Sequence, residues 1–156
     1  MTRLSALLAL LLVVSACDST VEAPALAQVS VGAKYSATTF RVTEAKTGTP
    51  LLDLLAVGAE MDIEFKSATR FTGRLFVPRS ALVETGETDD VDRDADWAVS
   101  GSYTQRNGTL TFVADREPFA DTFFDAKGWT ISPDGRSIHF VDVDDDVRVE
   151  VVLKRR

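Results

Sequence analysis

The sequence predicts an all-β domain, a small antiparallel up-and-down β-barrel of about eight strands with one short helix, and three observations support this prediction. From Lys34 onward, apolar and polar residues alternate with a period of two, which is the pattern of a half-buried strand. Short clusters of turn residues separate these runs. About eight strands leave two sheet edges to hide, and closure of the sheet removes both edges. A two-sheet β-sandwich is the alternative that the alternation leaves open.

Eight runs carry the strand pattern. They are residues 35–44, 61–66, 71–77, 97–103, 109–113, 129–131, 137–140 and 147–154. Asn107-Gly108 predicts a tight hairpin between two of these runs, because both residues accept the positive φ of a type I′ turn. Pro133-Asp134-Gly135 predicts a second hairpin, and Ser67-Ala68-Thr69 a third. Three hairpins in one short chain favour an antiparallel sheet.

One segment departs from the strand pattern. Residues 51–58 follow Pro50 and are apolar with helical spacing, which predicts a short helix that closes one end of the barrel and ends at Gly58. Residues 80–94 are polar and predict a long loop. The phase of each strand then gives an inward set. Its members are Met61, Ile63, Phe65, Phe71, Leu75, Trp97, Val99, Tyr103, Leu110, Phe112, Trp129, Ile131, Ile138, Phe140, Val149, Val151 and Leu153, with Gly73 and Gly101 on the same face.

The first residues have the features of an export signal. Arg3 precedes an apolar run over residues 7–14, and the small residues Ser15 and Ala16 follow it. A cation, a short apolar run and a small-residue cleavage site are typical of a secretory signal peptide. The run is shorter than the roughly 20 apolar residues that cross a bilayer. We therefore expect residues 1–16 to be a removable signal peptide.

The end of this signal also predicts an attachment to lipid. Val14-Ser15-Ala16-Cys17 resembles the lipobox of bacterial lipoproteins, which implies a diacylglyceryl thioether on Cys17 and cleavage just before it. Cys17 is the only cysteine, and lipidation accounts for a lone thiol in an exported protein. We expect residues 17–33 to be a lipidated cysteine and flexible tether, and residues 34–156 to be the barrel domain. The expected location is the bacterial cell envelope, at the inner or the outer membrane.

Composition and single residues argue against several other functions. The net charge of −7 makes the chain a poor candidate for binding nucleic acid or anionic lipid headgroups through charge. His139 is the only histidine, so a catalytic triad or a histidine metal cluster lacks partners. The acidic runs 89–96 and 142–146 lack the glycine and glutamate of a calcium loop, and we favour solvated loops. We predict no enzymatic activity, no cofactor and no metal site.

A family resemblance appears along the barrel region. Leu54-Leu55-Ala56-Val57-Gly58-Ala59, Arg74-Leu75-Phe76-Val77-Pro78, Gly101-Ser102-Tyr103 and Ala120-Asp121-Thr122-Phe123 occur in this order before a valine-rich last strand. This order resembles uncharacterised bacterial lipocalin-like lipoproteins over most of residues 34–156. The resemblance implies a barrel and a ligand cavity.

Two functions follow as alternatives. In the first, a membrane-anchored barrel binds a small apolar ligand through its aromatic residues. They are Phe65, Phe71, Trp97, Tyr103, Phe112, Trp129 and Phe140. In the second, these aromatics fill the core, as aromatics commonly do, and the protein is a structural or interaction lipoprotein that binds another envelope protein. Phe76, Val113 and Val152 are out of phase with the inward set and are then candidates for the outer contact surface.

Overall fold

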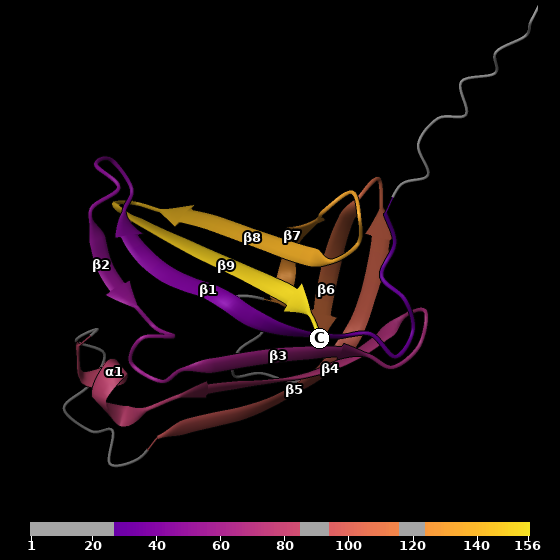
Figure 1. Cartoon of the computed structure of the whole chain (residues 1–156), viewed down its shortest axis with the longest axis horizontal. Helices are drawn as coiled ribbons and strands as arrows, with labels where there is room; N and C mark the ends of the chain where they lie inside the picture. Colours follow the sequence, from indigo (N-terminus) through magenta and orange to yellow (C-terminus); the bar gives the residue numbers. More distant parts are fainter. Residues whose placement is uncertain (1–26, 85–93, 116–123) are drawn as a thin grey trace, which may run out of the picture.

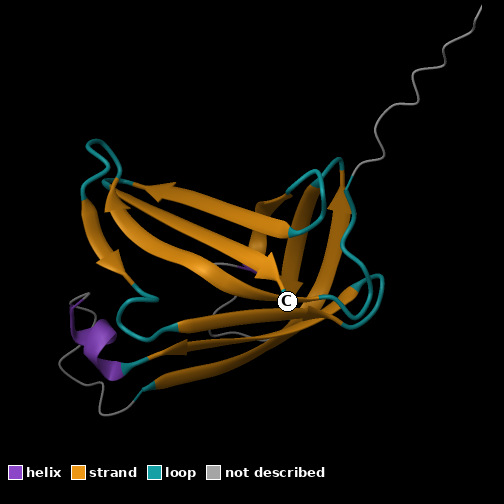
Figure 2. Ribbon diagram, viewed as in Figure 1, coloured by secondary structure: helices purple, strands orange, loops and turns teal. Residues whose placement is uncertain are grey.

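The computed structural model describes residues 27–84, 94–115 and 124–156. Within them lie nine strands and one short helix (Figure 2). The strands are β1 (Lys34–Glu44), β2 (Pro50–Asp53), β3 (Glu60–Phe65), β4 (Arg70–Val77), β5 (Ala95–Arg106), β6 (Thr109–Ala114), β7 (Asp125–Ile131), β8 (Ser137–Asp144) and β9 (Val147–Arg155), and the helix is α1 (Arg79–Glu84).

The strands form a closed antiparallel barrel. From β3 to β9 each strand pairs with the next one along the chain, and β1 closes the sheet by pairing with both β3 and β9 (Figure 1). The extra strand β2 lies outside this closed ring of eight and pairs only with the second half of β1, at Arg41 to Thr43. The prediction of a small eight-stranded up-and-down barrel is therefore confirmed, and the alternative sandwich is wrong.

The local strand and turn signals also agree with the structure. All eight predicted runs are strands, and the three predicted hairpins pair β3 with β4, β5 with β6 and β7 with β8. Asn107 and Gly108 have φ values of 51° and 75°, and Gly135 has a φ of 66°. These are the left-handed conformations that the turn residues were expected to adopt.

The predicted helix at 51–58 is wrong. The first half of this segment is β2, and a turn follows it. After Ser36, β1 no longer pairs with β3, so its edge is open to another strand. Leu52 pairs with Val42 there, and the Leu54 amide donates to the Phe40 carbonyl over 2.9 Å. Backbone pairing with this edge outweighs the local helical pattern. The short helix lies instead at α1, inside the predicted polar loop, of which residues 85–93 lie outside the described ranges.

The described part of the predicted tether is packed on the barrel. Residues 27–33 lie across one end, which we call the capped end (Figure 1). The Gln105 side chain holds this segment, because its amide nitrogen donates to the Ala27 carbonyl over 2.6 Å and its oxygen accepts from the Val29 amide over 3.1 Å. The Gly32 amide donates to the Phe65 carbonyl over 2.7 Å, and Ala33 is buried. Residues 27–33 are therefore packed against the barrel, to which their hydrogen bonds hold them.

The core occupies the barrel interior. The predicted inward set is buried except for three half-buried side chains, Trp97, Val99 and Val149. Tyr35, Phe40 and Phe124 are further buried aromatics that the inward set lacks. Phe124 precedes β7, in a stretch to which the sequence assigned no strand.

Two tyrosine hydroxyls form hydrogen bonds at the capped end. Tyr35 donates to the Gly135 carbonyl over 2.7 Å, and Tyr103 donates to the Ser67 carbonyl over 3.0 Å. Burial raises the pKa of Tyr35, with the nearby Asp134 charge acting in the same direction and Arg155 opposing it. Burial also raises the pKa of Tyr103. The folded protein therefore favours the neutral, donating form of both phenols.

This preference predicts a loss of stability in alkali. A raised folded-state pKa contributes stability that is complete below the unfolded tyrosine pKa of about 10 and disappears as the pH rises through the folded value. We expect the urea concentration at the unfolding midpoint to decrease when the pH is raised from neutral to above 10. The Tyr35→Phe, Tyr103→Phe double variant should lose part of this slope, because phenylalanine does not titrate. Urea titrations of both proteins across this range test the prediction, and identical slopes would contradict it.

Candidate functional site

Six of the seven aromatics that were candidates for a ligand pocket pack against one another as core. Each is at most 4% exposed, and they are Phe65, Phe71, Tyr103, Phe112, Trp129 and Phe140. Ring centroids lie 4.7 Å apart for Trp129 and Phe140, and 4.8 Å apart for both Phe65–Tyr103 and Phe71–Phe112. Phe124, which the sequence reasoning missed, stacks on Trp129 at 5.9 Å. These side chains occupy the space that an interior ligand would need.

The seventh aromatic, Trp97, lies in a different environment. It faces the interior from β5 opposite Leu75, toward the end of the barrel that is farther from residues 27–33, and it is only half-buried. Four larger aliphatic side chains of the inner face at this end are also half-buried. We call the five residues Val42, Leu52, Trp97, Val99 and Val149 the apolar rim. The sequence could not reveal Leu52 as a member, because its segment has a helical pattern.

The register of β1, β9 and β8 shows how far along the barrel axis the apolar rim lies from the core. Phe40, Val151 and Phe140 are opposite one another and fully buried. One layer closer to the barrel end, the inward-facing residues are Val42, Val149 and Asp142, all half-buried. The layer after that, at the end of the barrel, contains Glu44, Val147 and Asp144. The apolar rim therefore lies between a filled aromatic core and an end that carries carboxylates.

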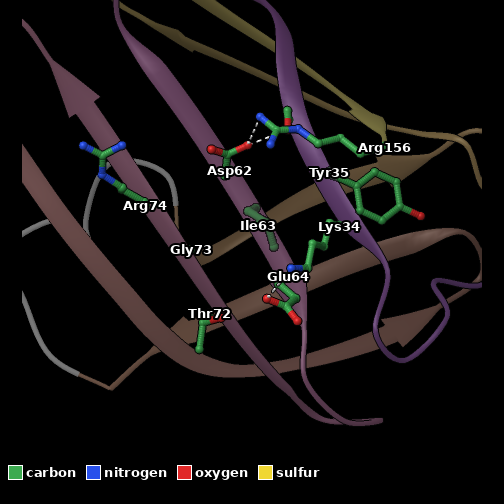
Figure 3. Close-up of a pocket in the computed structure, with 10 residues that line it drawn as sticks. Lys34, Tyr35, Asp62, Ile63, Glu64, Thr72, Gly73, Arg74 and Arg156 are labelled. Carbon is green, nitrogen blue, oxygen red and sulfur yellow. Dashed lines mark hydrogen bonds and ion pairs between the residues drawn. The ribbon is translucent and has the colours of Figure 1, made fainter.

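A groove of about 270 Å³ lies on the outer surface where β1 leaves β3 (Figure 3). Its lining is charged and internally paired. Asp62 accepts from the Ser36 hydroxyl over 2.5 Å and from Arg156 over 3.0 Å. Glu64 pairs with Lys66 at 2.7 Å and with Lys34 at 3.6 Å, and hydrogen bonding from Lys66 is the main cause that lowers the pKa of Glu64.

This groove does not match the expected apolar pocket. Its lining contains none of the seven candidate aromatics, and its ion pairs already satisfy the charged groups that face it. Its volume also lies below the roughly 300 Å³ at which small-molecule pockets usually begin. We interpret the groove as a solvated ion-pair network on the barrel wall.

The residues considered for catalysis and metal binding lie on the surface. His139 is exposed on the outer face of β8, where its Nε2 lies 3.0 Å from the Ser137 hydroxyl. In the first acidic run, Asp94 accepts from the Arg79 amide over 2.9 Å and Asp96 binds Arg74, whereas residues 89–93 lie outside the described ranges. In the second run, Asp146 pairs with Lys46 at 2.5 Å. Within residues 27–84, 94–115 and 124–156, no three potential ligand residues are grouped to hold a metal ion.

The three predicted outward residues do not form one surface. Val113 is 52% exposed on β6, whereas Phe76 on β4 is half-buried, with the Arg74 guanidinium carbon 5.4 Å from its ring centroid. Val152 on β9 is half-buried between Thr39 and His139. Their strands are not neighbours in the sheet order. Val141 and Val143 on β8, which are 45% and 56% exposed, are the larger apolar feature of the outer face.

Neither a search for membrane-spanning helices nor a comparison with known proteins assigns a function to the chain. The described helix is too short and too polar to cross a membrane. No family model matches the chain, and no curated protein matches it.

Proposed function

We propose that this protein is a lipoprotein of the bacterial cell envelope, cut before Cys17 and anchored through lipid on that cysteine, whose lipocalin-like barrel binds a small apolar ligand at the apolar rim. The observation that supports the ligand is the partial exposure of Trp97 on the inner face. On the neighbouring strand its partner Leu75 is only 3% exposed. A half-buried indole gains contact area when an apolar group covers it. The proposal includes no catalytic step and no cofactor.

The filled core limits the size of such a ligand. Because Phe112, Trp129 and Phe140 occupy the middle of the barrel, an apolar group can reach only the outer layer of the interior. A compact apolar molecule, or the apolar portion of a larger one, fits this geometry better than a long chain inserted along the barrel axis.

The second candidate is a structural or interaction lipoprotein with a filled barrel. The close aromatic packing favours it, and so do Val141 and Val143, which are exposed on one strand of the outer face. A contact there with another envelope protein would cover both valines. The two candidates share the lipid anchor and differ in whether a small molecule accompanies the protein.

One experiment tests the anchor and the ligand together. The full chain is expressed in a bacterial host with its leader, extracted from membranes in mild detergent, and measured by mass spectrometry in native and denaturing conditions. We expect a polypeptide that begins at Cys17 and carries diacylglyceryl mass, and a small apolar molecule that is released on denaturation. The Cys17→Ser variant should lack the added mass, because serine offers no thiol for the thioether.

Two variants locate the ligand. Trp97→Ala should lower the amount of co-purified molecule several-fold, whereas Phe76→Ala, a half-buried aromatic on the outer face, should leave it unchanged. An unmodified amino terminus in the membrane fraction would refute the anchor. A lipidated protein that carries no small molecule would refute the binding barrel and favour the interaction lipoprotein.

A further inference from the structure

The charges of this acidic protein are separated along the barrel axis. Eight exposed cations gather on the capped half, and they are Lys34, Lys66, Arg70, Arg106, Arg136, Lys154, Arg155 and Arg156. The carboxylates there are Asp62 and Asp115, which pair with Arg156 and Arg70, together with Glu64 and Asp134. These eight cations and four carboxylates give a net charge of +4 for the described side chains of this half.

The opposite half has the reverse sign. Its carboxylates are Glu44, Asp53, Glu60, Asp94, Asp96, Asp142, Asp144, Asp145, Asp146 and Glu150, and its cations are Arg41, Lys46, Arg74, Arg79 and Arg148. These ten carboxylates and five cations give a net charge of −5 for the described side chains. The described side chains therefore form a basic end and an acidic end, although the whole chain carries a net charge of −7.

The chain also enters the barrel at the basic end. Residues 27–33, the first that the structure describes, lie across the capped end (Figure 1). Nine residues lie between Cys17 and Ala27, which are therefore ten residue steps apart. Ten residues reach at most about 35 Å when fully extended and about 17 Å as a flexible coil. An anchor at Cys17 would therefore hold the basic end, rather than the acidic end, close to the lipid surface.

We propose that the capped end is a docking surface for an anionic bilayer, which orients the barrel with the apolar rim facing away from the membrane. This inference rests on the proposed anchor for proximity and on the charge separation for orientation. Basic side chains are attracted to anionic headgroups within a Debye length of the surface, whereas the acidic end is repelled. A ligand of the apolar rim would then enter from the aqueous side.

The test uses two variants of the full-length protein, each labelled with a dye at a different end of the barrel. Thr69→Cys lies in the β3–β4 turn at the capped end, and Thr49→Cys lies in the β1–β2 turn at the opposite end; both threonines are exposed. The labelled proteins are reconstituted in vesicles of phosphatidylcholine alone or mixed with phosphatidylglycerol, with a spin-labelled headgroup lipid as quencher. We expect quenching at Thr69→Cys to exceed quenching at Thr49→Cys several-fold in the anionic vesicles. At about 1 M salt, where the Debye length is about 3 Å, the excess should shrink to the smaller value that the tether alone gives in phosphatidylcholine vesicles.

Matched charge variants assign the effect to the basic end. The triple substitution Arg106→Gln, Arg136→Gln, Lys154→Gln removes three exposed cations from the capped half. Each removal should weaken attraction to the anionic surface about fivefold, so the capped-end quenching should fall to its value in phosphatidylcholine. Lys46→Gln, Arg79→Gln, Arg148→Gln makes the same charge change on the opposite half and should leave the quenching unchanged. Urea titrations of both variants confirm that they are folded.

The outcomes separate this inference from the proposed anchor. Wild-type protein labelled in parallel takes up no dye if Cys17 is lipidated, and takes up dye there if it is free. Free Cys17 together with strong capped-end quenching in anionic vesicles would refute the anchor and support the docking surface. Equal quenching at the two ends in anionic vesicles, or insensitivity to the capped-end substitutions, would overturn the docking surface whatever the state of Cys17.

Discussion

Replacing Trp129 by alanine is expected to destabilise the barrel by about 3–5 kcal/mol, the usual cost of removing a fully buried large aromatic. Trp129 is 0% exposed, and three aromatic rings surround it. Its ring lies 4.7 Å from Phe140, 5.8 Å from Phe112 and 5.9 Å from Phe124. The three belong to β8, β6 and the residue before β7, so the cavity would loosen contacts among three parts of the wall.

Trp97→Ala is the matched control for this prediction. The sequence places both tryptophans on the inner face, and a core position for Trp97 would imply the same large loss. Because Trp97 is half-buried in the structure, we expect a loss of only about 1–2 kcal/mol. Urea unfolding at neutral pH, followed by circular dichroism, measures both values. Equal losses for the two variants would contradict the difference in depth and remove the support for a ligand at the apolar rim.

The second large effect is expected at Gly101, where β5 and β6 come close together. A Cβ atom at this position would lie 2.2 Å from the Val113 carbonyl oxygen and 2.9 Å from the Ala114 Cα. Both obstacles are backbone atoms of the paired strand, so a side-chain rotation cannot make room. We expect Gly101→Ala to cost about 3 kcal/mol or more, above the usual range for overpacking, because the β5–β6 pairing itself must move.

Gly128→Ala provides the comparison within the same barrel. Its Cβ would meet only the Thr109 Cγ2, at 3.2 Å, and a threonine methyl on the outer face can shift. We expect its free energy of unfolding to change by less than about 0.5 kcal/mol, as for most surface substitutions. Thermal and urea unfolding of the two variants, measured side by side, test the pair. Similar stabilities for both would show that the strands can separate at Gly101 without loss.

The strand prediction succeeded where local chemistry and tertiary structure agree. The alternation of Met61, Ile63 and Phe65 determines which face of β3 is buried, because a one-residue shift would expose all three. Asn107-Gly108 determines a tight turn through its backbone preference alone. Such signals depend on residues next to one another in the chain, and the sequence contains all of them.

The candidate site could be predicted only in part. Period-two phase identifies inward side chains, but it does not say how deep in the barrel each one lies. Trp129 and Trp97 have the same phase, yet one has rings on several sides and the other lies toward the end of the wall. Depth depends on which layer of the neighbouring strands stands opposite. The register supplies that information, so the apolar rim could not be separated from the core by pattern.

By itself, the sequence determined the phase and number of the barrel strands, the hairpin turns and the total charge, since each depends on residue type and short spacing. Tertiary structure decided three other features. It made a strand of Leu51 and Leu52, because β1 offered an open edge. It turned residues 27–33 into a cap, because Gln105, far along the chain, supplied their hydrogen bonds. It also separated basic from acidic residues, because up-and-down strands bring distant turns together at each end.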